Sequence, residues 1–280
     1  MTAPARSWGA PDLADELAFS LEIAARAGRL LMERYERVEQ VDYKSARDVV
    51  TEVDHLSEAL ILEAIRRAWP GDGILAEESG GHAGTSAESL ARGRTWVVDP
   101  LDGTINYANG IPVFCVSVAL VVDGRPAVGV VHDPTRLEAF SAAAGGPARL
   151  DGRPITASDK ERLSDFVVSL ALGGRSVAMR ARNVRKAIRV PRSMGSAALA
   201  LAYVANGRFD AFVQQGGLSA WDVAAAGLIA DRAGATVTDL GGGPWFDLAR
   251  PPRSIGVLAA PRAHHRVLLD LVRQPPAKSD

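Results

Sequence analysis

The chain of 280 residues lacks the features that mark disulfide-rich or membrane-spanning proteins. Cys115 is its only cysteine, which excludes an intrachain disulfide and a metal site built from several thiolates. The longest apolar run, Val113 to Val122, falls well short of the roughly 18 residues that a membrane helix needs. Acidic residues near the N-terminus occupy the region where a signal peptide would be apolar, so we expect no such leader.

An excess of charge of one sign is also missing. Lys and Arg number 32 against 33 Asp and Glu, which gives a formal net charge of −1. Because nucleic-acid-binding domains usually present a strongly basic face, we expect no nucleic-acid partner. We also expect no membrane partner and a cytoplasmic location. The hydrophobic residues, 47% of the chain, suffice for one large α/β domain or two fused lobes.

The order of apolar patterns predicts a layered α/β fold. Helical spacing predicts an amphipathic helix from Leu13 to Val38, with Asp12 as its N-cap, and a second helix from about Leu56 to Ala68. The Asp123-Gly124 pair indicates a tight hairpin. The strand-like runs of the first half are 74–76, 96–98, 113–122, 126–132 and 138–143.

The second half alternates strand-like and helix-like runs, which is typical of α/β proteins. We expect strands at 166–172, 209–213, 235–238 and 255–258, and helices at 176–187, 196–205, 221–233 and 263–273. A stretch rich in Gly and Pro at 145–154 is expected to form a seam between two packed lobes of one domain, about 13–146 and about 147–273.

The most informative segment lies directly after a predicted strand. Asp99 and Asp102 follow the apolar run, with Pro100 between them. Carboxylates at a strand end are displayed at an edge of the sheet, where hard cations can reach them. Gly103 and Thr104 come next, and a helical turn starting there would offer N–H groups to an anion. Phosphoryl hydrolysis requires such a cation site beside a phosphate site, although an Asp-Gly turn alone is common.

Other acidic residues stand at comparable places. Glu77 and Glu78 follow another predicted strand, Asp54 leads into the second helix, and Asp222 opens an alanine-rich helix. Each has an ordinary structural explanation, as a solvated strand end, a helix cap or a partner of the helix dipole. Their joint occurrence favours convergence on one site.

Four ordered blocks resemble the inositol monophosphatase family, within the magnesium-dependent, lithium-sensitive sugar-phosphate phosphatases. The blocks are Asp48-x-x-Thr51-x-x-Asp54, Glu77-Glu78-Ser79, Asp99-Pro100-Leu101-Asp102-Gly103-Thr104-Ile105-Asn106-Tyr107, and Trp221-Asp222 before the alanine-rich helix. The resemblance covers about residues 17–272. It implies a layered α-β-α-β-α fold, a single domain over 13–273 and a homodimer that hydrolyses a small phosphorylated polyol or sugar.

The resemblance also implies roles for individual residues. Two or three Mg2+ ions would be held by Glu77, Asp99, the Leu101 carbonyl, Asp102 and Asp222. Mn2+ could replace Mg2+, and Li+ would inhibit the enzyme. Asp54 would orient Thr104, which with Glu77 would position and deprotonate the attacking water. Lys44 would border the active-site loop. The substrate contacts would be Asp102, Gly103, Thr104, Gly195, Ser196, Ala197, Gln215 and Asp222.

The identity of the substrate stays open at this point. The ending Ile105-Asn106-Tyr107 favours myo-inositol 1-phosphate, whereas Gln215 stands where inositol-phosphate enzymes often carry Glu. Histidinol phosphate, fructose 1,6-bisphosphate and 3′-phosphoadenosine 5′-phosphate are the alternatives, and Arg185 and Arg192 are candidates for a second phosphate. A non-catalytic binding protein would be expected to have lost one of the acidic residues. A scaffold acting through dimer contacts of the alanine-rich helices is the remaining alternative.

Overall fold

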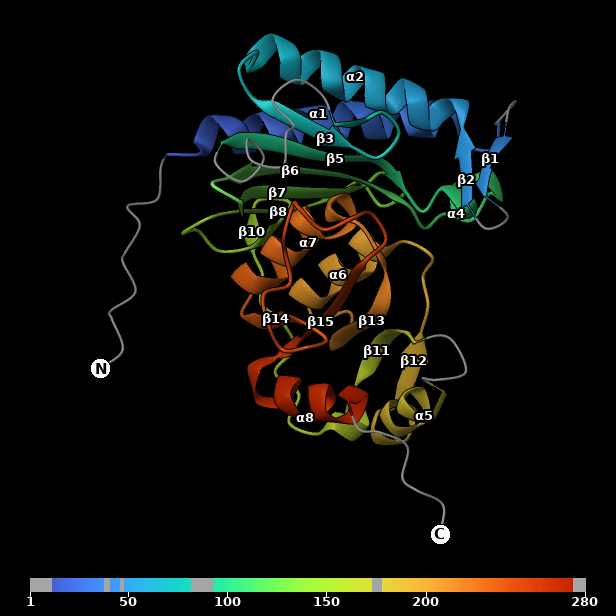
Figure 1. Cartoon of the computed structure of the whole chain (residues 1–280), viewed down its shortest axis with the longest axis vertical. Coiled ribbons are helices and arrows are strands. Elements are labelled where there is room, and N and C mark those ends of the chain that lie inside the picture. The colour runs from blue at the N-terminus through green and yellow to red at the C-terminus, as the bar shows by residue number, and fades with distance from the viewer. Residues whose placement is uncertain (1–11, 38–40, 46–47, 82–92, 173–177, 274–280) are drawn as a thin grey trace.

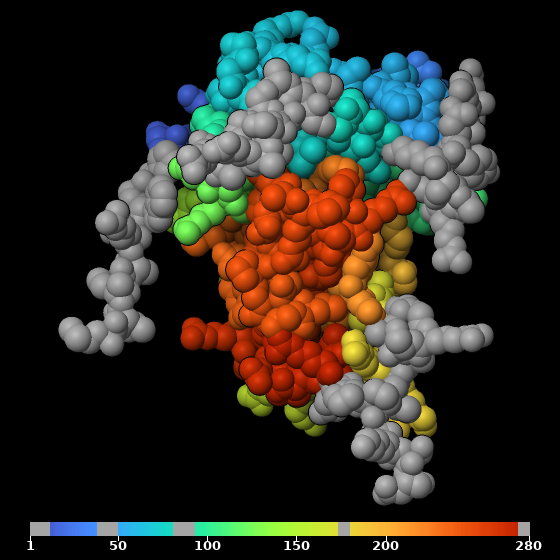
Figure 2. Space-filling model, viewed as in Figure 1, coloured from blue at the N-terminus to red at the C-terminus, as the bar shows by residue number. Residues whose placement is uncertain are grey.

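The structure, a computed structural model, describes residues 12–37, 41–45, 48–81, 93–172 and 178–273. These parts stack as helix, sheet, helix, sheet and helix from top to bottom of Figure 1. This order confirms the predicted layered α/β fold. In the space-filling view, the early part of the chain, in blue and teal, lies directly against the later part, in orange (Figure 2). Among the described helices, none is long and apolar enough to cross a membrane.

The first layer consists of α1 (Ala14–Arg34) and α2 (Glu52–Ala68), which pack on one face of the first sheet (Figure 1). Buried residues of α1 recur at helical spacing, among them Ala24, Ala27 and Leu31. The N-cap of α1 is Leu13 rather than the predicted Asp12, although Asp12 Oδ1 accepts a hydrogen bond from Ala14 N at 3.2 Å. The helix also ends at Arg34, before the predicted end at residue 38.

The prediction for the start of α2 was wrong. The helix begins at Glu52, not Leu56, because Thr51 and Asp54 form a capping box ahead of the apolar face. Thr51 Oγ1 accepts a hydrogen bond from Val53 N at 3.2 Å, and Asp54 Oδ2 accepts one from Thr51 N at 2.8 Å. A hairpin of β1 (Val41–Ser45) and β2 (Asp48–Thr51), which the sequence did not predict, precedes this cap.

The first sheet has eight strands in the order β10-β9-β8-β7-β6-β5-β3-β4. Among the strands of this sheet that the structure describes, only β3 and β5 pair in parallel. The hairpin of β6 and β7 turns at Asp123 and Gly124, both with positive φ (49° and 73°), as predicted. The strands are β3 (Gly73–Ala76), β4 (Gly80–Gly81), β5 (Arg94–Asp102), β6 (Cys115–Val122), β7 (Arg125–Asp133), β8 (Glu138–Ala143), β9 (Arg149–Leu150) and β10 (Arg153–Pro154). The expected seam at 145–154 therefore contributes β9 and β10 to this sheet.

The central layer consists of α6 (Ala197–Ala205) and α7 (Ala220–Arg232), between the two sheets (Figure 1). Small side chains let these helices approach the sheets closely. A Cβ added at Gly129 of β7 would lie only 2.8 Å from Ala225 Cα. Because residues 198–205 are all buried, α6 is an interior helix rather than an exposed packing surface.

The second sheet has five strands in the order β12-β11-β13-β15-β14. Its outer face is covered by α5 (Ala178–Ala187) and α8 (Arg262–Arg273) (Figure 1). A 3-10 turn (Leu163–Asp165) leads into it. The strands are β11 (Val167–Ala171), β12 (Val190–Arg192), β13 (Ala211–Leu218), β14 (Ala235–Asp239) and β15 (Ile255–Pro261).

Candidate functional site

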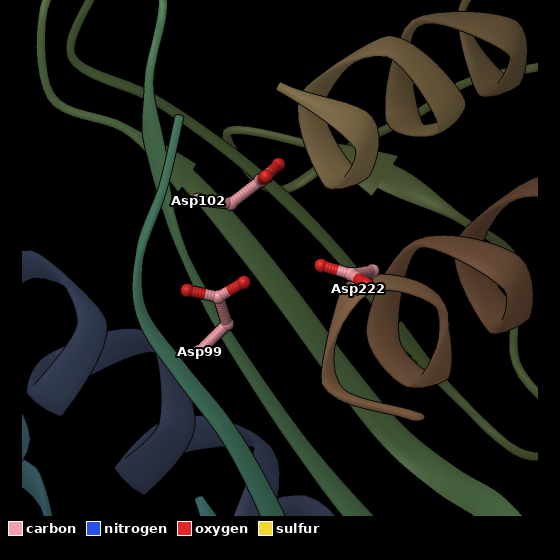
Figure 3. Close-up of side chains that lie close together, drawn as sticks. All are labelled: Asp99, Asp102 and Asp222. Carbon is pink, nitrogen blue, oxygen red and sulfur yellow. The ribbon is translucent and has the colours of Figure 1, made fainter. Parts of the chain in front are cut away.

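Three aspartates meet between the end of a strand in the first sheet and the start of a helix in the central layer. Asp99 and Asp102 lie at the end of β5, and Asp222 lies in the first turn of α7 (Figure 3). One carboxylate oxygen from each lies within 4.8 Å of the other two. Residues that are far apart in sequence thus form one acidic cluster, the "acid cluster" below.

The end of β5 is shaped so that both aspartates reach the cluster. The pairing with β6 shifts register between Asp99 and Asp102, at the position of Pro100, which has no N–H to donate. Asp99 Oδ1 accepts a hydrogen bond from Leu101 N at 3.1 Å. Gly103 then turns the chain with φ of 100° into the short helix α4 (Thr104–Ala108). A Cβ at this glycine would lie 2.9 Å from the Val113 carbonyl oxygen, so no other residue fits.

Glu77 adds a fourth carboxylate to the site. It follows β3, lines the same hollow as the acid cluster, and lies close enough to Asp99 for its charge to raise the pKa of that carboxyl. Glu58 of α2 fixes this turn, because its carboxylate accepts hydrogen bonds from Glu78 N (2.9 Å) and Ser79 N (3.0 Å). The structure therefore places Glu77, rather than Glu78, in the site.

Burial and mutual repulsion disfavour the charged form of these carboxylates. Burial, followed by the charge of Glu77, raises the pKa of Asp99 well above its ordinary value. Burial, followed by the charge of Asp102, does the same to the pKa of Asp222. Burial also raises the pKa of Asp102, although hydrogen bonds from residues 196 to 199 oppose the rise. A set of oxygen donors that needs compensating positive charge fits a hard divalent cation such as Mg2+.

Asp54 and Thr104 adjoin the acid cluster. Thr104 Oγ1 lies 3.0 Å from both Asp54 Oδ1 and the Leu101 carbonyl oxygen, and its single proton can serve one of them at a time. Asp54 is buried, and its other oxygen accepts hydrogen bonds from Thr51. Asp54 is thus both a helix cap and the partner of Thr104.

Two adjoining hollows open at the acid cluster. The first has a volume of about 350 Å³, and the second, of about 320 Å³, shares Asp102, Gly195, Gly217 and Asp222 with it. The predicted site residues that line the first hollow are Glu77, Asp99, Leu101, Asp102, Gly103, Thr104, Gly195 and Asp222. Ser196 and Ala197 line the second.

Other predicted residues lie elsewhere. Gln215 is exposed and lines neither hollow, whereas its neighbour Gln214 lines the second. Arg185 and Arg192 are exposed on α5 and β12, and among the described residues neither takes part in these hollows. The side chain of Lys44 lies outside the parts that the structure describes.

The sequence analysis missed Arg253, which lines the first hollow. Its backbone has a φ of 63°, unusual for a residue other than glycine. Two hydrogen bonds fix this conformation: Arg253 N donates to Ser219 Oγ, and its carbonyl oxygen accepts from Gly217 N, both at 3.0 Å. The Pro251-Pro252 pair before it was the only local signal of a constrained loop.

The layered fold and the buried carboxylates at its centre are features of metal-dependent phosphatases. Residues 12–276 match the inositol monophosphatase family, and the chain belongs to this family. An inositol-1-monophosphatase of Mesorhizobium japonicum is 36% identical over 91% of the chain and 95% of its own length. The fructose-1,6-bisphosphatase/inositol-1-monophosphatase of Thermotoga maritima is 37% identical over 81% of the chain and 86% of its own length.

Other relatives carry a different name. A protein of Pasteurella multocida called Nus factor SuhB is 38% identical over 81% of the chain and 86% of its own length. The crystal structure of the extragenic suppressor protein suhB from Bartonella henselae superimposes with a TM-score of 0.84 at 33% identity, covering 93% of the chain and 99% of that structure.

Proposed function

We propose that the protein hydrolyses a small phosphate monoester with the help of Mg2+, and that myo-inositol 1-phosphate is the preferred substrate. The observation that carries this proposal is the convergence of Asp99, Asp102 and Asp222 within 4.8 Å, with Glu77 lining the same hollow. A protein that had kept the fold for binding alone would have no need of two buried and two half-buried carboxylates whose repulsion is costly.

The residues that would hold the metal are Glu77, Asp99, the Leu101 carbonyl, Asp102 and Asp222. When bound, Mg2+ lowers the pKa of coordinated water and neutralises charge on the phosphoryl oxygens. The protein's part is to fix the ligands in place. The hydrogen bonds of Asp99 to Leu101 N and of Asp102 to α6 do this.

Thr104 and Glu77 would act on the attacking water. When the Thr104 hydroxyl donates to Asp54 Oδ1, its oxygen lone pairs remain able to accept a hydrogen bond from the water and so position it. The Glu77 carboxylate lines the same hollow and would accept the one proton that this water loses as it attacks the phosphate. Asp54 would orient Thr104.

The remaining lining residues would bind the substrate. Gly103, Thr104 and Gly195 line the first hollow, and Ala197 lines the second, so small residues leave space for phosphate and polyol beside the acid cluster. Gln215 was expected to contact a ring hydroxyl. The position of Gln214 in the second hollow makes it the amide that would do so.

Release of inorganic phosphate tests this proposal. The purified protein is assayed with Mg2+ against myo-inositol 1-phosphate, histidinol phosphate, fructose 1,6-bisphosphate and 3′-phosphoadenosine 5′-phosphate. We expect the highest kcat/KM for the inositol ester, and loss of activity with EDTA or millimolar Li+. Absence of phosphate release from every substrate would contradict the proposed reaction, whereas a different ranking would change only the substrate. We further propose that the protein is a homodimer and that it is located in the cytoplasm. The molar mass in solution tests the homodimer, and fractionation of cells tests the location.

A further inference from the structure

Asp102 connects the first sheet to the central helix layer through its side chain. It belongs to β5 of the first sheet, but its carboxylate lies at the N-terminal end of α6. Oδ2 accepts hydrogen bonds from Ser196 Oγ at 2.6 Å and from Ala198 N at 2.7 Å, and the Cys115 thiol lies 3.7 Å away. Oδ1 accepts one longer bond, from Ala197 N at 3.2 Å.

Ser196 is the only one of these donors with a rotatable hydroxyl. It stands at the N-cap of α6, yet its side chain makes no capping bond to its own helix. The hydroxyl is instead directed at Asp102, whose carboxylate caps the first turn of α6 in its place. Ser196 is 2% exposed, so this bond lies away from water.

A second set of contacts holds Ser196 in this position. Asn106 Nδ2 donates to the carbonyl oxygens of Met194 and Val113, each at 2.7 Å. Gly195 has a φ of 77°, and a Cβ there would lie 2.9 Å from the Asn106 amide. The segment before α6 is thereby tied to the chain after α4 and to α4 itself, which carries Thr104.

We propose that Ser196 is a positioning residue for the metal site: its hydroxyl holds Oδ2 of Asp102 and leaves Oδ1 as the oxygen available to a divalent cation. This inference rests on the proposed function and assigns Ser196 a role other than contact with the substrate. The hydroxyl acts through Asp102, because a ligand carboxylate that can rotate spends less time in the geometry that Mg2+ requires.

Binding of Mg2+ alone, without substrate, is the decisive measurement. We expect Ser196→Ala to weaken the Kd for Mg2+ by about tenfold or more, since loss of a partner of a ligand typically costs about 10- to 100-fold in metal affinity. Ser196→Thr keeps the hydroxyl and should restore most of the affinity. Isothermal titration and the Mg2+-dependent shift in Tm report the effect independently of turnover.

Ser20→Ala is the matched control. Ser20 is a buried serine in α1 whose hydroxyl donates to the Glu16 carbonyl oxygen at 2.7 Å, and it lines neither hollow at the acid cluster. Its replacement removes one buried hydroxyl bond as well, so it shows how much Mg2+ affinity changes through general loosening of the fold. We expect its Kd for Mg2+ to equal that of the wild type.

The outcomes separate the possible roles. An unchanged or tighter Kd for Mg2+ in Ser196→Ala would overturn the proposal, and a raised KM with unchanged kcat and Kd would show that Ser196 binds substrate instead. A lower Tm of the metal-free protein with unchanged Kd would show a structural role only, which also overturns it. If the wild type binds Mg2+ but releases phosphate from no substrate, the proposed function fails while the effect of Ser196 on Mg2+ binding remains testable.

Discussion

Thr104 Oγ1 lies 3.0 Å from Asp54 Oδ1, although 50 positions separate the two residues in sequence. The contact forms because α2 begins beside the end of β5, where Ser57 Oγ also donates to the Pro100 carbonyl oxygen at 2.9 Å. The residue that caps α2 is therefore also the residue that orients the hydroxyl next to the acid cluster. A structural and a proposed catalytic role share one carboxylate.

Replacement of Thr104 separates these roles. Thr104→Val keeps the shape of the side chain but removes the hydroxyl, while the capping bonds of Asp54 to Thr51 remain. We expect kcat to fall by about 10²- to 10⁴-fold, the usual contribution of a group that assists proton transfer, with little change in Tm. Thr104→Ser is the control and should keep most of the activity. Turnover of Thr104→Val at the wild-type rate would remove Thr104 from the mechanism.

The stability of the metal-free protein should depend on pH in an unusual direction. Burial and neighbouring charges raise the pKa of Asp99 and of Asp222 above the values of the unfolded chain. The stability that these groups contribute is fully present below about pH 4 and is lost as the pH rises through the raised pKa values. Binding of Mg2+ displaces the protons, so its stabilising effect grows as the pH rises.

Thermal unfolding in EDTA and in saturating Mg2+ measures this effect. We expect the difference in Tm between the two conditions to widen from about pH 5 to about pH 8. A difference that stays constant over this range would mean that the carboxylates are already ionised without metal. That result would contradict the raised pKa values.

Asp99→Asn tests the acid cluster as a charged unit. The amide is nearly the same size but carries no charge, so the repulsion felt by Glu77 and Asp222 decreases. We expect the Tm of the metal-free protein at neutral pH to stay the same or rise, while Mg2+ binding and phosphatase activity are lost. A folded variant that retains activity would exclude Asp99 as a metal ligand.

The sequence predicted the elements that have a long apolar pattern or a characteristic turn. Runs such as Val113 to Val122 and the Asp123-Gly124 turn carry enough local information to specify a hairpin. The five- and four-residue strands β1 and β2 are too short for a clear pattern. The start of α2 was placed too late because Asp54 was considered as a possible helix cap, whereas Thr51 is the N-cap and Asp54 is its partner in the capping box.

In the site, too, the residues that stand in a motif were predicted, and the contacts between distant segments were not. Asp99 and Asp102 stand three positions apart in one motif, so the sequence alone predicted that they share a site, and the structure brings Asp222 to them. The bond between Ser196 and Asp102 and the approach of Arg253 depend on how distant segments pack. No local sequence pattern predicts these contacts. Ser196 and Asp102 are 94 positions apart, and Arg253 lies in a loop without a recognisable motif.

Arg253 should weaken metal binding and assist substrate binding. Burial raises the pKa of Asp222, and the positive charge of Arg253 partly opposes that rise, so the guanidinium lies close enough to act on the acid cluster. Loss of the charge in Arg253→Gln should tighten Mg2+ binding by a few-fold, about 1 kcal/mol or less, and raise KM for a phosphate dianion. The matched control is Arg250→Gln, because Arg250 pairs with Asp239 at 3.4 Å. Equal Kd values for Mg2+ in both variants and the wild type would contradict this role.

The two adjacent glutamines of β13 offer a test of substrate choice within one strand. Gln214 lines the second hollow, whereas Gln215 is exposed. Successive side chains of a strand point to opposite faces, so only one of the two can face the bound polyol. Gln214→Glu should change the ranking of kcat/KM among the four substrates, because it replaces a donor amide by a charge. Gln215→Glu, the matched control, should leave the ranking unchanged, and the reverse result would show that Gln215 faces the substrate when it is bound.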